Sequence, residues 1–87
     1  MELKWTDKNE AHIARYGVSP AEVEQALSGR PLVFLHGREH TIIAQGTTYA
    51  GRYLTIVLTE SIDGRFYVVT ARDMTLRELN TFRKKEQ

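Results

Sequence analysis

The stretch Tyr67–Glu78, YVVTARDMTLRE, contains the junction between the last predicted strand and the last predicted helix. Its apolar, β-branched run ends at Arg72, and Thr75 and Glu78 follow at the spacing of a capping box, which marks a helix start. A guanidinium at such a strand end can receive a phosphate or a carboxylate. Pairing of Arg72 with Asp73 or another surface acid is the commoner role for that spacing.

Two further helix starts lie in the N-terminal third of the chain. The segment Ser19–Glu22 combines an N-cap serine, a proline at the first helical position and a glutamate that closes the capping box. It predicts a helix that ends at Gly29. A first helix is expected to begin near Asp7, with Glu10 closing its box, and to stop at Gly17.

The chain after Pro31 changes to short β-rich runs. They cover Leu32–His36, His40–Gln45, Arg52–Thr59 and Phe66–Arg72. Short, glycine-containing connections predict antiparallel neighbours in a meander, and Glu2–Trp5 is a candidate for an additional short edge strand. Alternation puts Leu54, Ile56 and Leu58 on one face, which the helices should cover. The predicted fold is therefore α+β: two N-terminal helices, a four-stranded antiparallel β-meander and a C-terminal helix.

The composition indicates one soluble globular domain over residues 1–87. Of these residues, 41% are hydrophobic and 26% are charged. The chain has no cysteine, which favours a reducing cytoplasm. No apolar run reaches membrane-spanning length and no export signal is recognisable at the N-terminus, so we expect a cytoplasmic protein that does not enter a membrane.

The charge is small overall but unevenly distributed. A net charge of +1 argues against a large general affinity for nucleic acid. Basic residues nevertheless concentrate near the C-terminus, where Arg77 and Lys84 join Arg72. A one-sided positive field is thus compatible with the low net charge.

Several residues, in order along nearly the whole chain, carry a resemblance to a known family. They are Trp5, Lys8, Gly17-Val18-Ser19, Glu22, Thr70-Ala71-Arg72, Thr75, Glu78 and Phe82. Together they resemble the BrnT-type toxins of bacterial toxin–antitoxin pairs. The resemblance implies a RelE-like fold, ribonuclease activity, and a small DNA-binding antitoxin as partner, through which a homo-oligomer can form. The family usually has arginine where this chain has Tyr67, and histidine where it has Tyr16.

Residues suited to metal-independent RNA cleavage occur on the first predicted helix. Such a reaction uses the 2′-hydroxyl of the RNA as nucleophile and needs a base, an acid and cations. Lys8, His12 and Arg15 fall at i, i+4 and i+7, so all three can share a face. His12 is the best acid/base candidate because imidazole titrates near neutrality, and a half-buried packing role is the alternative.

The strands offer further candidates for contact with RNA. Arg52 and Arg72 stand at ends of neighbouring strands and are predicted to clamp one phosphate as catalytic cations. Tyr67 can stack on a base, although an aromatic residue on a strand more often packs in the core. Arg15, Arg77 and Lys84 are predicted to bind RNA. Of these, Arg77 and Lys84, with Arg52 and Arg72, are also candidates for the antitoxin-binding face.

Other chemistries receive little support from the sequence. His36 and His40 flank a predicted turn, but two imidazoles with Glu39 between them make a weak metal site, so we expect no metal. No glycine-rich phosphate loop or dinucleotide fingerprint is present, and no cofactor is expected. Tyr67 and the low net charge keep a second function open, a non-catalytic module that binds protein or nucleic acid on the same scaffold.

Overall fold

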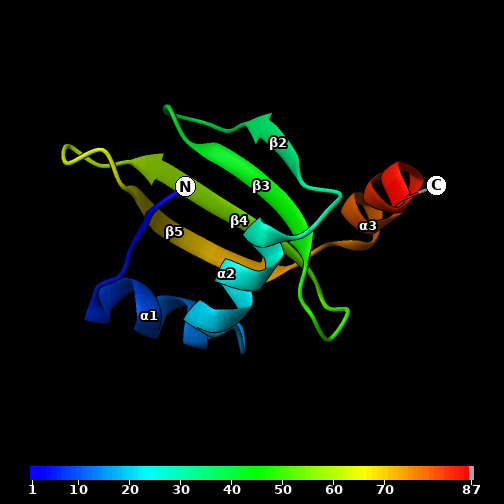
Figure 1. Ribbon diagram of the computed structural model, residues 1–87, viewed down its shortest axis with the longest axis horizontal. Helices are drawn as coiled ribbons and strands as arrows, with labels where there is room; N and C mark the ends of the chain where they lie inside the picture. Colours follow the sequence, from blue (N-terminus) through cyan, green and yellow to red (C-terminus); the bar gives the residue numbers. More distant parts are fainter. Residues whose placement is uncertain (87) are drawn as a thin grey trace.

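The computed structural model describes residues 1–86 (Figure 1). Its elements are β1 (Leu3–Lys4), α1 (Asp7–Ala14), α2 (Pro20–Ser28), β2 (Val33–His36), β3 (Ile42–Thr47), β4 (Tyr53–Glu60), β5 (Phe66–Asp73), α3 (Leu76–Arg83) and a 3₁₀ turn over Lys84–Glu86. The α+β class predicted from the sequence is confirmed. Within the part of the chain that the structure describes, no helix has the length and apolar character needed to cross a membrane.

The sheet has five strands rather than the four expected. Their order is β1-β5-β4-β3-β2, and β1 lies parallel to β5 while all other neighbours are antiparallel. The prediction of a purely antiparallel, four-stranded sheet was therefore wrong. Leu3 lies opposite Phe66, whose N–H donates to the carbonyl oxygen of Glu2 over 2.9 Å. A strand of two residues is too short to produce a periodic pattern, which is why it counted only as a candidate.

The capping boxes explain where the helices begin. Those of Ser19 with Glu22 and of Thr75 with Glu78 form as predicted. The box predicted for α1 was wrong, because Thr6 is the N-cap and Asn9 closes the box. The buried Asn9 amide accepts from the Thr6 N–H over 2.8 Å and donates to the Lys4 carbonyl over 2.9 Å. The side-chain amide of Asn9 thus closes the capping box at the start of α1 and also connects this helix to β1.

The hydrophobic core lies between the sheet and the first two helices, which cover one face (Figure 1). Leu54, Ile56 and Leu58 of β4 are fully buried on that face, as the alternation predicted. Gly46 of β3 allows α2 to approach closely, since a Cβ there would clash with the carbonyl oxygen of Ala26. The position of α2 over the sheet therefore depends on a residue without a side chain.

The opposite face of the sheet is covered by α3 at one end. Phe82 is fully buried and packs edge-on against Tyr53, with ring centroids 5.8 Å apart. The neighbouring Thr55 is also buried, and its hydroxyl donates to Glu78 over 3.1 Å. This packing fixes α3 against the ends of β4 and β5.

One arginine joins the helical layer to the sheet. The guanidinium of Arg52 donates to Asp73 over 2.7 and 3.2 Å, to Glu22 over 3.3 Å, and to the carbonyl oxygens of Gly17 and Tyr16 over 2.6 and 3.1 Å. We call these five residues the Arg52 network. Hydrogen bonding to Asp73 is the main cause of the raised pKa of Arg52, and the same bond lowers the pKa of Asp73. The Nε, Nη1 and Nη2 atoms of the planar guanidinium all donate, and the single ammonium group of a lysine cannot reproduce this arrangement.

A second ion pair joins β5 to α3. Arg72 donates to both carboxylate oxygens of Glu78, over 2.7 and 3.2 Å. The hydrogen bond from Arg72 is the largest cause that holds the pKa of Glu78 at about 2, and the Thr75 backbone N–H adds to it. Glu78 therefore serves at once as the capping residue of α3 and as the partner of Arg72.

We expect Arg52→Met to lower the free energy of unfolding by about 2–3 kcal/mol, because it leaves two carboxylates and two carbonyl oxygens without their donor. Urea unfolding at pH 7 measures the effect. Arg38→Met, which removes an exposed arginine on the β2–β3 turn, is the matched control and should change stability by less than about 0.5 kcal/mol. Equal stability of Arg52→Met and the unmodified protein would contradict a structural role for the network.

We expect Glu78→Gln to lower the free energy of unfolding by about 1–2 kcal/mol at pH 7, a value reduced by solvent screening because 38% of the Arg72 side chain is exposed. Glutamine still closes the capping box, so the loss reports the ion pair. Since the pKa of Glu78 falls from 4.5 to about 2 on folding, its contribution is complete above pH 4.5 and disappears toward pH 2. Melting curves of both proteins should therefore converge as the pH falls through that interval, and a constant difference would contradict this assignment.

Candidate functional site

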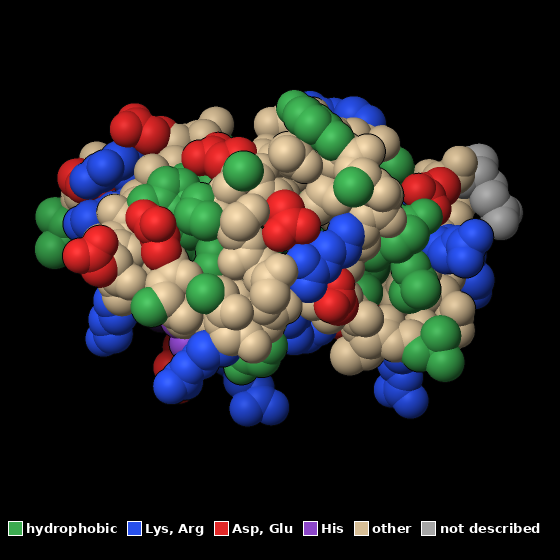
Figure 2. All heavy atoms as spheres, turned by 90° about the horizontal axis from the view of Figure 1, so that it is seen from below, with side chains coloured by type: hydrophobic (Ala, Val, Ile, Leu, Met, Phe, Trp, Pro, Cys, Tyr) green, Lys and Arg blue, Asp and Glu red, His purple; other side chains and the backbone are tan. Residues whose placement is uncertain are grey.

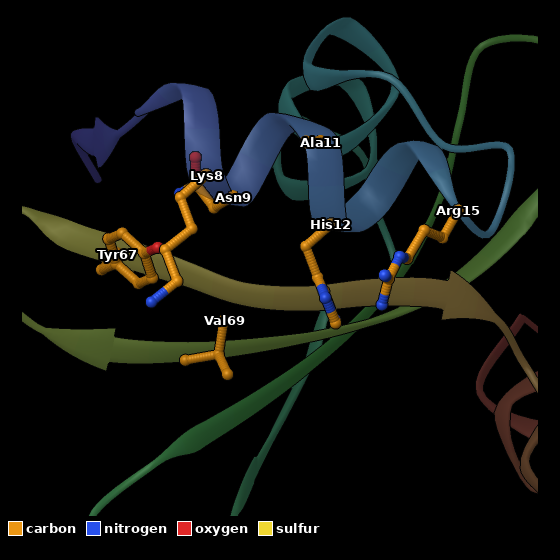
Figure 3. Close-up of a pocket in the computed structure, with 7 residues that line it drawn as sticks. All are labelled: Lys8, Asn9, Ala11, His12, Arg15, Tyr67 and Val69. Atoms are coloured by element: carbon orange, nitrogen blue, oxygen red, sulfur yellow. The ribbon is translucent and has the colours of Figure 1, made fainter.

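A hollow of about 520 Å³ lies between α1 and β5 (Figure 3). Its lining residues are Lys8, Asn9, Ala11, His12, Arg15, Tyr67 and Val69. We call it the α1–β5 groove. It contains the three residues that were predicted to share a face of the first helix, together with the tyrosine predicted to contact RNA. The structure thus brings together candidates that lie more than fifty residues apart in the sequence.

The periodicity of α1 explains how it faces the groove. Ile13 is fully buried against the core, which turns the side of the helix that carries Lys8, His12 and Arg15 toward β5. Figure 3 shows Lys8 beside Tyr67 at one end of the groove and His12 beside Arg15 toward the other. The groove is therefore lined by one helix face and one strand.

His12 is held in a defined orientation. Its Nε2 lies 3.1 Å from Oγ1 of Thr70 on β5, and its ring packs edge-on against Tyr16 with centroids 5.7 Å apart. Its Nδ1 has no hydrogen-bond partner among residues 1–86. Because a hydroxyl both donates and accepts, Thr70 is compatible with either neutral tautomer of the imidazole. The ring is thus oriented by packing and hydrogen bonding while one nitrogen is left without a partner from the described chain.

The groove is positively charged. Lys8 and Arg15 are exposed, and neither forms an ion pair with any residue in the described range 1–86. Figure 2 shows basic side chains projecting along one edge of the molecule, with a histidine among them. Unpaired cations around a concave surface attract an anionic ligand, for which phosphate is the general biological example.

The two arginines predicted to clamp a phosphate do not form that clamp. Arg52 and Arg72 line no part of the groove, and both are engaged by carboxylates. Arg52 pairs with Asp73, which follows Arg72 on β5 and so points to the opposite face of the sheet. The guanidinium groups of Arg52 and Arg72 therefore lie on opposite faces of the sheet. The proximity of strand ends was predicted correctly, and Arg72 takes the alternative role of pairing with a surface acid, which is Glu78. The acidic partners of Arg52 were not predicted.

The remaining predicted RNA-binding residues lie elsewhere. Arg77 is on α3 and Lys84 begins the turn that follows it, and both are exposed. Neither lines the groove, and Figure 1 shows α3 at the opposite end of the molecule from α1. They form a separate basic surface.

Of the lining residues, Asn9, Ala11 and Val69 were not predicted, and the position of Val69, with Thr70 beside it, depends on a bulge. Val57 pairs with Thr70 and Leu58 with Val68, which leaves Val69 without a partner in the β4–β5 register. Val69 then lines the groove, 39% exposed, and Thr70 reaches His12. A bulge without a glycine leaves no mark in the alternation of side chains, so no local signal identified these two residues.

The donor set of the groove does not suit a divalent metal. It offers one imidazole next to two cations, and oxygen or sulfur ligands are what most metals need beside histidine. Among residues 1–86, no three histidine, cysteine, aspartate or glutamate side chains come close enough to hold a metal ion. The arrangement instead combines an acid/base group, cations and an aromatic ring. No family model, curated protein or solved structure matches this chain, so its function is argued from this groove.

Proposed function

We propose that the protein is a metal-independent ribonuclease of the BrnT toxin type, with a RelE-like scaffold, that acts on RNA in the cytoplasm. The observation that carries the proposal is the convergence of His12 with Lys8, Arg15 and Tyr67 in the α1–β5 groove. These side chains supply the chemical groups that cleavage through the 2′-hydroxyl requires. The BrnT-like residues of the sequence give the proposal its second support.

The reaction is an internal transfer of the phosphodiester. The 2′-oxygen attacks phosphorus and loses its proton, the bond from phosphorus to the 5′-oxygen breaks, and that oxygen takes up a proton. The products are a 2′,3′-cyclic phosphate and a 5′-hydroxyl. Lys8 and Arg15 stand four residues before and three residues after His12, and they offset the negative charge that develops on the phosphorus oxygens.

His12 carries the proton transfer through Nδ1. When Nε2 donates to Thr70, Nδ1 has a free lone pair and can take the proton of the 2′-hydroxyl. The imidazolium that results still donates to Thr70 through Nε2 and can pass the proton on Nδ1 to the leaving 5′-oxygen. Thr70 is a positioning residue in this scheme because it contacts the imidazole rather than the RNA. This relation supports acid/base use of His12 without a second histidine.

A second candidate function is binding of RNA without cleavage. It is favoured by the engagement of Arg52 and Arg72 with carboxylates, which leaves only two side-chain cations beside His12 in the groove. Both functions require Lys8, Arg15 and Tyr67, but only cleavage requires the imidazole. Substitution of His12 therefore distinguishes them.

We expect His12→Gln to slow cleavage of a single-stranded RNA by about 10²- to 10⁴-fold, the usual contribution of a general acid or base. Glutamine can retain a hydrogen bond to Thr70, so the fold should persist. The rate is measured with end-labelled RNA in excess chelator, and the products are tested for a cyclic phosphate. The double variant Lys8→Ala/Arg15→Ala should lose RNA binding as well.

The control for loss of positive charge is Arg38→Gln, which lies outside the groove and should cleave like the unmodified protein. Full activity of His12→Gln would contradict the catalytic assignment. RNA binding by unmodified protein without any cleavage would favour the second candidate. Activity that required one divalent ion after chelation would overturn the metal-independent mechanism.

The partner that follows from this function is a small DNA-binding antitoxin that covers the groove. We expect the product of a neighbouring gene to form a stable complex, and Lys8→Glu/Arg15→Glu to weaken it by about tenfold or more, because charge reversal opposes an acidic partner. The matched pair Arg77→Glu/Lys84→Glu tests the separate basic surface of α3. Co-expression followed by size-exclusion chromatography and titration measures both. This partner assignment would be contradicted if the product of the neighbouring gene were folded but eluted separately. It would also be contradicted if the complex formed equally well with the groove substitutions.

A further inference from the structure

Tyr16 is a large aromatic side chain that is not part of the hydrophobic core. It follows the last turn of α1, and 48% of its surface is exposed. Its ring contacts His12 edge-on at an interplanar angle of 65°. An exposed ring beside the proposed catalytic group presents a flat apolar surface to whatever occupies the groove.

The backbone beneath Tyr16 is fixed by the Arg52 network. The carbonyl oxygen of Tyr16 accepts from Arg52 over 3.1 Å, and that of Gly17 accepts over 2.6 Å. Gly17 has a φ of +68°, which turns the chain away immediately after the tyrosine. The backbone that carries the ring is therefore already fixed before a ligand binds. Stacking of a ligand on Tyr16 then costs little conformational entropy of the backbone.

Two pairs of residues across α1 and β5, together with the contact between His12 and Tyr16, show where Tyr16 lies. Lys8 and Tyr67 line one end of the groove, and His12 meets Thr70 farther along. Tyr16 follows His12 by four residues, and the centroids of the two rings are 5.7 Å apart.

Tyr67 thus lies at one end of the groove, His12 lies farther along it, and Tyr16 borders the groove beyond His12. Tyr67 lies beside Lys8 in the first turn of α1, whereas Tyr16 follows the end of that helix at Ala14, so the two tyrosines lie near opposite ends of α1. Each tyrosine can take one base, while the phosphate between the two bases lies beside His12, Lys8 and Arg15. The groove therefore matches a short stretch of RNA rather than an isolated phosphate.

We propose that Tyr16 and Tyr67 are two stacking sites that hold the bases on either side of the phosphate at His12, so that the substrate is single-stranded RNA with both bases unpaired. This inference rests on the proposed function and adds its substrate class and a specificity-determining residue, Tyr16. Bases inside a duplex are stacked on each other and cannot reach the tyrosines. Any base can stack on a tyrosine, so these sites distinguish single-stranded from double-stranded RNA rather than one base sequence from another.

Binding of an RNA that cannot be cleaved tests the inference separately from catalysis. The probe is a single-stranded 2′-O-methyl oligonucleotide with 2-aminopurine at one position, whose fluorescence is quenched when the base stacks. The variants are Tyr16→Ala, Tyr16→Phe and, as matched control, Tyr49→Ala, which removes a tyrosine that is 81% exposed on the β3–β4 turn. Melting temperatures establish that each variant is folded.

Tyr16→Ala is expected to weaken binding by about 5- to 150-fold and to abolish part of the quenching, because a base–aromatic stack has that value. Tyr16→Phe keeps the ring and should behave like the unmodified protein, as should Tyr49→Ala. A duplex of the same sequence should bind at least tenfold more weakly than the single strand.

The outcomes separate the two proposals. Quenching that depends on Tyr16, in a protein that cleaves no RNA, would support the stacking sites and contradict the ribonuclease. Cleavage by the unmodified protein together with unchanged binding and quenching in Tyr16→Ala would overturn the stacking site alone. Equal affinity for duplex and single strand would overturn the substrate class, and failure to bind either probe would overturn both proposals.

Discussion

The planar donor group of Arg52 is the constraint on which the rest of this small structure depends. It joins the end of β5, the start of α2 and the turn after α1, three segments that are distant in the sequence. All of the guanidinium nitrogens of Arg52 donate to its own chain, which leaves few donors for a ligand. Arg52, predicted as a phosphate-binding residue at a strand end, therefore has a structural role.

Much of the fold was predictable because its signals are local. Capping boxes at Ser19 and Thr75 and the alternation along β4 each depend on residues a few positions apart, and all were confirmed. The errors involve interactions over long separations. The parallel pairing of β1 with β5 joins the two ends of the domain, and Asn9 replaced Glu10 as the capping residue because its amide also reaches the carbonyl of Lys4.

The candidate site shows the same division. Helical spacing was enough to place Lys8, His12 and Arg15 on one face, and the structure confirms that they share it. The surface opposite that face depends on the bulge at Val69, and the pairing of each arginine depends on which carboxylate lies within reach. Neither property is encoded in a short window of sequence. Residue types indicated the chemistry of the groove, whereas the register of β5 decided which of them meet.

The groove is built from two segments that lie far apart in the sequence, with α1 on one side and β5 on the other. During synthesis, residues up to Ala14 leave the ribosome long before β5 has been translated, so the emerging chain carries His12 and its neighbouring cations without the strand that orients them. A polypeptide cut short before β5 lacks Tyr67 and Thr70 and encloses no groove. Formation of the α1–β5 groove is thereby coupled to completion of nearly the whole domain.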